Sequence, residues 1–182
     1  MTNKIKELLS KKDFILIAID GRCGAGKTTL AEKLGKEFSA NVIHMDDFFL
    51  RPEQRTEKRL LTPGENIDHE RFLNEVLIPL SENKSFSYRP FNCKTQSLSE
   101  PISIIPSKVT VIEGSYSCHP QLWDFYDLHI FVDTDCKTQL ERIEKRNGEE
   151  IAKIFKNKWI PLEESYFKEF NIKESCEIKE EN

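Results

Sequence analysis

Short, continuous apolar runs dominate the hydrophobic pattern of this chain. Residues 14–19, 109–114 and 128–133 are rich in β-branched and aromatic side chains, with almost no polar alternation. Runs of this kind are typical of strands that are buried on both faces, as in a parallel sheet. Weaker runs at 41–45 and 176–179 predict two further strands.

Helical periodicity fills the segments between these runs. Apolar side chains recur every three or four residues in segments 30–38, 72–80, 136–143 and 155–170. Pro161 lies within the last segment, so we expect that helix to kink or break just before it. The alternation of strands and helices predicts the α/β class, here a three-layer sandwich around a mostly parallel sheet of five strands.

Residues 81–107 break this rhythm. The segment is rich in Ser, Pro and Asn, and it predicts an extended excursion or a hairpin. Insertions on an α/β core commonly carry the residues that recognise a substrate. We therefore expect this one to lie on the substrate side of a single domain that spans 1–182.

Composition narrows the functional classes. The net charge of −4 gives no basic surface of the kind that binds nucleic acid, so we expect no such partner. No apolar stretch reaches membrane-spanning length, and the first ten residues lack the apolar core of a signal peptide. The five cysteines are odd in number and form no C-x-x-C pair, which favours reduced thiols and a cytoplasmic location.

A glycine-rich turn follows the first predicted strand. Its sequence satisfies the pattern G-x-x-x-x-G-K-[ST], which predicts a phosphate-binding loop, or P-loop, at residues 21–28. Backbone N–H groups can surround a triphosphate only where side chains are missing, and the following helix adds its positive dipole end. We expect Lys27 to reach the β- and γ-phosphates of ATP and the Thr28 hydroxyl to bind Mg²⁺. The predicted nucleotide-binding residues are Gly21, Arg22, Cys23, Gly24, Ala25, Gly26, Lys27, Thr28 and Thr29.

A carboxylate at the end of a neighbouring strand should complete the metal site. Glu113 closes one apolar run and is followed by Gly114, which lets the chain turn away. Asp133 closes another run and is the alternative. Because Asp133 precedes a helical pattern and fits a helix cap, we favour Glu113.

Two carboxylates, Asp46 and Asp47, directly follow the run at 41–45. Ligands of open α/β sheets bind beyond the carboxyl ends of the strands. A carboxylate at this place could therefore accept the proton of an attacking hydroxyl as a general base. Adjacent side chains point in different directions, so we expect only one of the two to face the site.

Several stretches occur in a characteristic order along the chain: "GRCGAGKTT", "HMDDFF", "NIDHERF", "VIEG" and "FVDTDCKTQLERIEKRNG". Together they resemble the uridine kinase family of P-loop kinases, which also contains nicotinamide riboside kinases, pantothenate kinases and phosphoribulokinases. The resemblance covers nearly the whole chain. The motifs D-[DS]-F-[FY] and N-[FI]-D-H make it much more specific than the P-loop alone.

The resemblance implies a role for each matching residue. Asp46 would be the base that takes the proton from a primary hydroxyl, and Asp47 would lie beside the substrate. Asp68 would hold sugar hydroxyls, although it also lies where the next helix should be capped. The two roles of Asp68 are compatible.

The segment that recognises the base in uridine kinases departs from the family pattern. Here it reads "YRPFNCKTQS" and lacks the usual histidine. Tyr88 could stack on a base, whereas Arg89 could favour a substrate that carries an acidic group. The acceptor therefore stays open between a nucleoside, pantothenate and a sugar.

Arg142 and Arg146 lie four residues apart on one side of a predicted helix. Such a pair could clamp the transferring phosphoryl group from a short lid at 142–150; the alternative is a solvated face paired with nearby glutamates. A base, a metal carboxylate and an arginine pair favour an ATP- and Mg²⁺-dependent kinase of a small hydroxylated molecule. They speak against a regulatory module that only binds ATP. The resemblance also permits a homo-oligomer.

Overall fold

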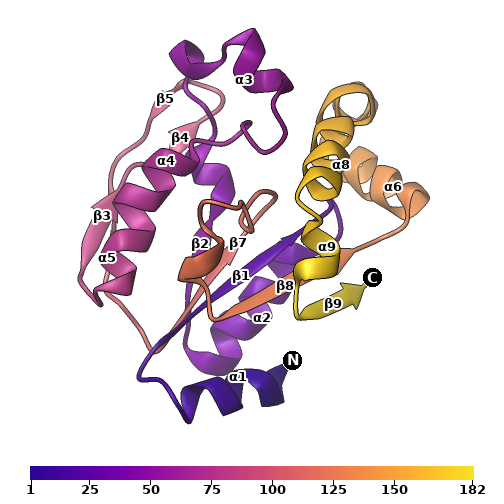
Figure 1. The fold of residues 1–182 in the computed structure, drawn as a ribbon. Helices are drawn as coiled ribbons and strands as arrows, with labels where there is room; N and C mark the ends of the chain where they lie inside the picture. The colour runs from indigo at the N-terminus through magenta and orange to yellow at the C-terminus, as the bar shows by residue number, and fades with distance from the viewer.

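A parallel sheet of five strands forms the centre of the molecule, whose residues 1–182 are all described by a computed structural model (Figure 1). The strand order is β2-β7-β1-β8-β9, and every neighbouring pair is parallel. This confirms the predicted fold class; the last strand begins two residues later than predicted. The strands are β1 (Ile15–Gly21), β2 (Asn41–His44), β7 (Val109–Glu113), β8 (Leu128–Asp133) and β9 (Ile178–Glu181).

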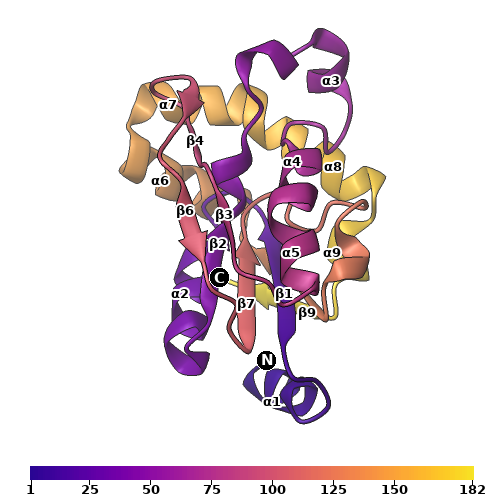
Figure 2. The same cartoon turned by 90° about the vertical axis from the view of Figure 1, so that its left-hand side faces the viewer.

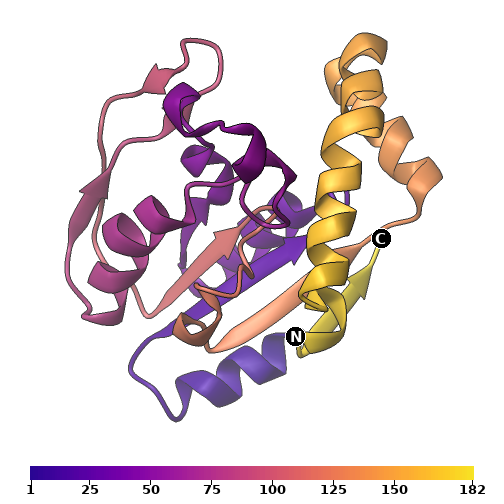
Figure 3. The same cartoon turned by 45° about the horizontal axis from the view of Figure 1, so that its top comes forward.

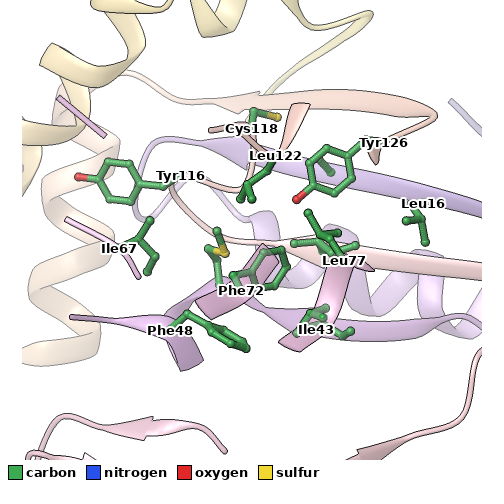
Figure 4. Close-up of a cluster of buried hydrophobic side chains, with 14 of the residues drawn as sticks. Leu16, Ile43, Phe48, Ile67, Phe72, Leu77, Tyr116, Cys118, Leu122 and Tyr126 are labelled. Carbon is green, nitrogen blue, oxygen red and sulfur yellow. The ribbon is translucent and has the colours of Figure 1, made fainter. Parts of the chain in front are cut away.

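Side chains of the central strand β1 alternate between two cores, because successive strand residues point to opposite faces. The odd-numbered residues of 15–19 belong to a core with α1 (Thr2–Leu9) and α2 (Lys27–Phe38). Leu16 and Ala18 belong to a larger core on the other face, part of which is drawn in Figure 4. The helical segment 69–81 and α8 (Ile160–Glu169) cover that second core. The two cores account for the three layers of the sandwich.

Two of the helical segments contain a π-helical turn just before a proline. Residues 69–81 run as α4 (His69–Phe72), η3 (Leu73–Leu77) and α5 (Ile78–Ser81), and Pro79 lies in the first turn of α5. Residues 149–169 run as α7 (Glu149–Ile154), η5 (Phe155–Trp159) and α8, where Pro161 has the same place. A wider turn accommodates a residue that has no N–H to donate. The predicted interruption at Pro161 is therefore a π-helical turn, and the helix does not break.

The segment at 81–107 forms an antiparallel hairpin in two steps (Figure 2). β3 (Phe86–Tyr88) pairs with β6 (Ile102–Ile104), and β4 (Phe91–Asn92) pairs with β5 (Ser97–Leu98). Its return strand leads to the edge of the main sheet, where the Asn41 side chain donates to the Ile105 carbonyl at 2.8 Å. The remaining elements are η1 (Met45–Phe48), η2 (Pro52–Gln54), α3 (Glu57–Leu61), η4 (Trp123–Phe125), α6 (Cys136–Asn147) and α9 (Ile172–Ser175). None of the helices combines the length and the apolar character that a membrane crossing requires.

A pair of buried histidines joins the loop after β7 to the helix at 69–81. The rings of His69 and His119 stack with centroids 4.2 Å apart, and both residues are buried. Gly64 lies against the His119 ring, where a Cβ atom would come within 3.0 Å of it. Burial and, to a smaller extent, the neighbouring His69 together lower the pKa of His119 to about 3.

Acidification should therefore destabilise the protein through His119. Its pKa is about 3 in the folded chain and 6.5 ordinarily, so the stabilisation is complete above pH 6.5 and is lost as the pH falls toward 3. Between pH 7.5 and pH 5 this amounts to about 2 kcal/mol of unfolding free energy. Urea denaturation at both pH values measures it. In the His119→Phe variant, which keeps a ring but has no titrating group, the loss should shrink by that amount; an equal loss would contradict the assignment.

Candidate active site

A large cleft opens beyond the carboxyl ends of β1, β2 and β7. Its volume is about 1100 Å³, and it is lined by 29 residues. Residues 51–104 rise on one side of this sheet edge, and the helices of residues 136–169 rise on the other (Figure 3). The P-loop lies at the bottom of the cleft, since residues 23–29 line it. The strand order explains this position, because β1 is paired on both sides and its following loop emerges at the middle of the sheet.

The backbone of the P-loop depends on glycine at its first position. Gly21 has a φ of 132°, and a Cβ atom there would lie 2.0 Å from the Val132 carbonyl oxygen of the neighbouring strand. The Arg22 side chain anchors the loop to two other segments: its guanidinium donates to Asp133 at 2.8 Å and to Glu164 at 2.6 Å. Gly21 and Arg22 do not line the cleft, and both support the loop. Their contact with nucleotide stays a prediction.

Lys27, at the start of α2, folds back over the loop. Its Nζ donates to the Gly21 carbonyl at 2.6 Å and to the Arg22 carbonyl at 3.0 Å, and it lies 3.3 Å from the Ser115 hydroxyl. These three oxygens are neutral acceptors. Phosphate oxygens carry full charges and would be stronger acceptors for the same ammonium group.

Thr28 and Glu113 meet at the side of the cleft. The Thr28 hydroxyl lies 3.2 Å from each carboxylate oxygen of Glu113, and the His44 Nδ1 lies 2.6 Å from Glu113 Oε1. The hydrogen bond to Glu113 raises the pKa of His44, although partial burial opposes it. A hydroxyl and a carboxylate side by side are the hard oxygen ligands that Mg²⁺ prefers, so this pair fits the expected metal.

Asp133, the alternative metal ligand, is engaged elsewhere. Arg22 and Lys173 both bond to its carboxylate, and the Thr134 N–H donates to it at 2.8 Å. Burial would raise its pKa, but the hydrogen bond from Lys173 and these other partners lower it overall. The carboxylate does not line the cleft and fixes the P-loop through Arg22.

Asp46 and Asp47 follow β2 in the 3₁₀ turn η1, and they point in different directions. Asp46 opens onto the cleft. Protein surrounds its carboxyl closely on the other sides, and this desolvation raises its pKa, while the charge of Lys27 lowers it. Asp47 turns toward the hairpin, where the Tyr88 hydroxyl donates to its Oδ2 at 2.9 Å.

The structure does not bring the other predicted substrate residues into the cleft. Asp68 is only 2% exposed; it caps α4 by accepting from the Arg71 N–H at 3.2 Å and accepts from the Gln54 amide at 2.8 Å. Tyr88 is buried against the Phe48 ring at a centroid distance of 5.1 Å. The Arg89 guanidinium donates to the Ser99 carbonyl within the hairpin at 2.6 Å. Of this insertion, only Cys93 and Gln96 line the cleft.

Arg142 and Arg146 both reach the cleft from α6. Arg142 donates to the Gly24 carbonyl at 3.2 Å, and the Arg146 guanidinium donates to the side chain of Asn147 at 2.8 Å. α6 ends at Asn147, and the φ of 84° at the following Gly148 starts a new helix, α7, in another direction. The two arginines therefore face the P-loop from a segment that a glycine joins to the next helix.

Glu163 of α8 is a cleft residue that the sequence pattern did not indicate. It is 6% exposed, and its Oε2 accepts from the Cys23 N–H of the P-loop at 3.1 Å. Its Oε1 accepts from the Ser115 hydroxyl at 2.6 Å. A protein carboxylate thus occupies an N–H group of a loop that is built to bind anions. Glu163 also raises the pKa of Asp46, after burial and Glu113.

Comparison with known proteins gives concordant matches. The sequence profile of the phosphoribulokinase/uridine kinase family matches residues 16–159. Uridine-cytidine kinase D of Dictyostelium discoideum is 32% identical over 130 residues, which are 69% of this chain and 25% of that protein. The uridine kinase of Brevibacillus brevis is 29% identical over 151 residues, which are 75% of this chain and 67% of that protein. The structure of a possible uridine kinase from Bacillus stearothermophilus has a TM-score of 0.70 over 98% of both chains at 18% identity, a likeness of fold alone.

Proposed function

The chain belongs to the phosphoribulokinase and uridine kinase family, and we propose that it transfers the γ-phosphoryl group of ATP to a hydroxyl of a nucleoside or a similar small metabolite. The observation that carries this proposal is the position of Asp46, which lines the same cleft as Lys27 and Thr28 of the P-loop. Beside the phosphates of ATP, a general base serves to take the proton of a hydroxyl that attacks the γ-phosphoryl group. A module that merely binds ATP needs none.

Each cleft residue then has a defined task. Asp46 accepts the proton of the acceptor hydroxyl and so makes that oxygen a better nucleophile. Lys27 and the backbone N–H groups of residues 24 and 26–28 would hold the phosphates, and Thr28 with Glu113 would hold Mg²⁺. Arg142 and Arg146 approach from α6 as part of a lid and neutralise charge on the transferring group. Bound Mg·ATP supplies the phosphoryl group and the metal charge that polarises it.

Release of ADP from Mg·ATP in the presence of candidate acceptors tests the proposal. The panel holds uridine, cytidine, nicotinamide riboside, pantothenate, ribose and fructose, and each reaction is compared with one that lacks an acceptor. We expect one compound class to stimulate ADP release and to gain a phosphoryl group, seen by mass spectrometry. Slow ADP release that no acceptor changes would point to an ATP-binding regulatory module instead.

A further inference from the structure

Asn66 has an unusual environment in the wall of the cleft. It is 5% exposed and lines the cleft, yet neither its Nδ2 nor its Oδ1 has a hydrogen-bond partner. Its neighbours are engaged, since Ile67 bridges to Phe49 and Asp68 caps α4. A buried amide normally finds partners for both its donor and its acceptor. Both atoms are also shielded from solvent, so the amide carries an uncompensated desolvation cost that a hydrogen-bonding ligand at the cleft would offset.

The segment that carries Asn66 lies between the candidate base and the loop after β7. On one side it runs antiparallel to the chain just after Asp46, with the Asp68 N–H donating to the Phe48 carbonyl at 2.8 Å. On the other side Gly64 contacts the ring of His119. Both neighbouring segments also line the cleft, one through Phe49 and the other through Tyr116.

Tyr116 is held in a strained conformation beside this segment. Its φ of 73° is unusual for a residue with a bulky side chain, and such strain occurs mainly at functional sites. Asp20 fixes its backbone by accepting from the Tyr116 N–H at 3.2 Å, and its ring lies 4.9 Å from the Tyr166 ring. Figure 4 shows its side chain on the same side of the core as Ile67, the residue after Asn66.

We propose that Asn66 and Tyr116 hold the phosphoryl acceptor, a role that rests on the kinase function proposed above. The Asn66 amide offers one donor and one acceptor, so it matches a hydroxyl pair or a carboxamide next to the reacting hydroxyl. The Tyr116 ring contacts the non-polar part of the same molecule. The acceptor is thus recognised by the cleft wall beside Asp46, two residues before the helix cap Asp68.

The Asn66→Leu variant separates this role from a structural one. Leucine has nearly the same shape and removes the two unpartnered polar atoms. We therefore expect the Tm of the unliganded protein to rise by about 2–4 °C. The KM for the best acceptor of the panel should rise by about 10- to 100-fold, the cost of two lost hydrogen bonds, while the KM for ATP stays unchanged. An amide that only supports the fold would give a lower Tm.

Two further variants complete the experiment. Asn66→Asp keeps the shape and loses the donor, so the KM for the acceptor should rise here as well. Asn74→Leu, on an exposed turn of the adjacent helix, is the matched control and should change neither KM. An unchanged acceptor KM in both Asn66 variants of an active kinase would overturn this inference alone. If no acceptor is found, the proposed function fails, and a lower Tm of Asn66→Leu still overturns the role of Asn66.

Discussion

Replacement of Asp46 by asparagine is expected to lower kcat by about 10²- to 10⁴-fold, the usual contribution of a positioned general base. Asparagine has the same shape and can still accept a hydrogen bond from the acceptor hydroxyl, but it cannot take the proton. The KM for ATP should therefore change little, because the P-loop contacts are untouched. Initial rates of acceptor-dependent ADP release, measured with the best acceptor of the panel, give both quantities.

The neighbouring carboxylate supplies the control. Asp47→Asn removes the same charge one residue away, but Asp47 faces Tyr88 and not the cleft. We expect it to retain most of the activity. If the two variants lose the same amount of activity, only the total negative charge of the turn matters. The assignment of Asp46 as the general base would then be wrong.

The pH dependence gives a second measure of the same assignment. Desolvation raises the pKa of Asp46, so the wild-type rate should fall on acidification at a higher pH than an ordinary carboxyl would give. The base works only when ionised, which fixes the direction: activity is present above this pKa and lost below it. We call this fall of the rate at low pH the acidic limb of the pH profile. The residual activity of Asp46→Asn should lack it.

The nucleotide side of the cleft could be predicted from the sequence because it is local. A P-loop joins one strand to the next helix, so the glycines, Lys27 and Thr28 are consecutive and their geometry follows from φ values that glycine permits. Glu113 could be added because parallel strands end at the same edge of the sheet. The glycine-lysine motif sufficed for the first step, and the pattern of apolar strands sufficed for the second.

The acceptor side could not be predicted in the same way, because distant segments build it. Asp68 and Asn66 stand two residues apart in one motif, and the sequence does not say which of them is turned to the cleft. The helix cap decides it, since an N-cap carboxylate must face the first N–H groups of its own helix. Tyr88 was misplaced for a related reason: its contacts are with η1, where its ring packs on Phe48 and its hydroxyl donates to Asp47.

Glu163 shows a further limit of periodicity. In the sequence it follows Pro161 on a helix with a strong apolar stripe, where a glutamate normally faces solvent. The chain brings α8 back across the P-loop before β9 pairs with β8, and this topology buries the side chain against the Cys23 N–H. The contact depends on tertiary structure alone, so no spacing rule could have indicated it.

Replacement of Lys27 by methionine is expected to lower kcat by about 10²- to 10³-fold or more, because a charged donor aimed at the reacting phosphates is lost. Methionine keeps most of the length of the side chain. The backbone N–H groups of the loop remain, so ATP should still bind, which fluorescence titration with a labelled nucleotide can measure. Lys33→Met is the matched control, because Lys33 lines the same cleft from the same helix at a greater distance from the loop.

The Lys27→Met variant should also change the pH profile. The positive charge of Lys27 lowers the pKa of Asp46, and it lowers that of the buried Asp20 as well. Without this charge Asp46 takes up its proton more readily, so the acidic limb of the residual activity should move to higher pH. A lower rate with an unmoved limb would mean that Lys27 contacts the phosphates without influencing Asp46. Lys27, unlike Lys33, lies among the carbonyl oxygens of the P-loop. If the acidic limb moves in the Lys33→Met control as well, the effect comes from the net charge of the cleft.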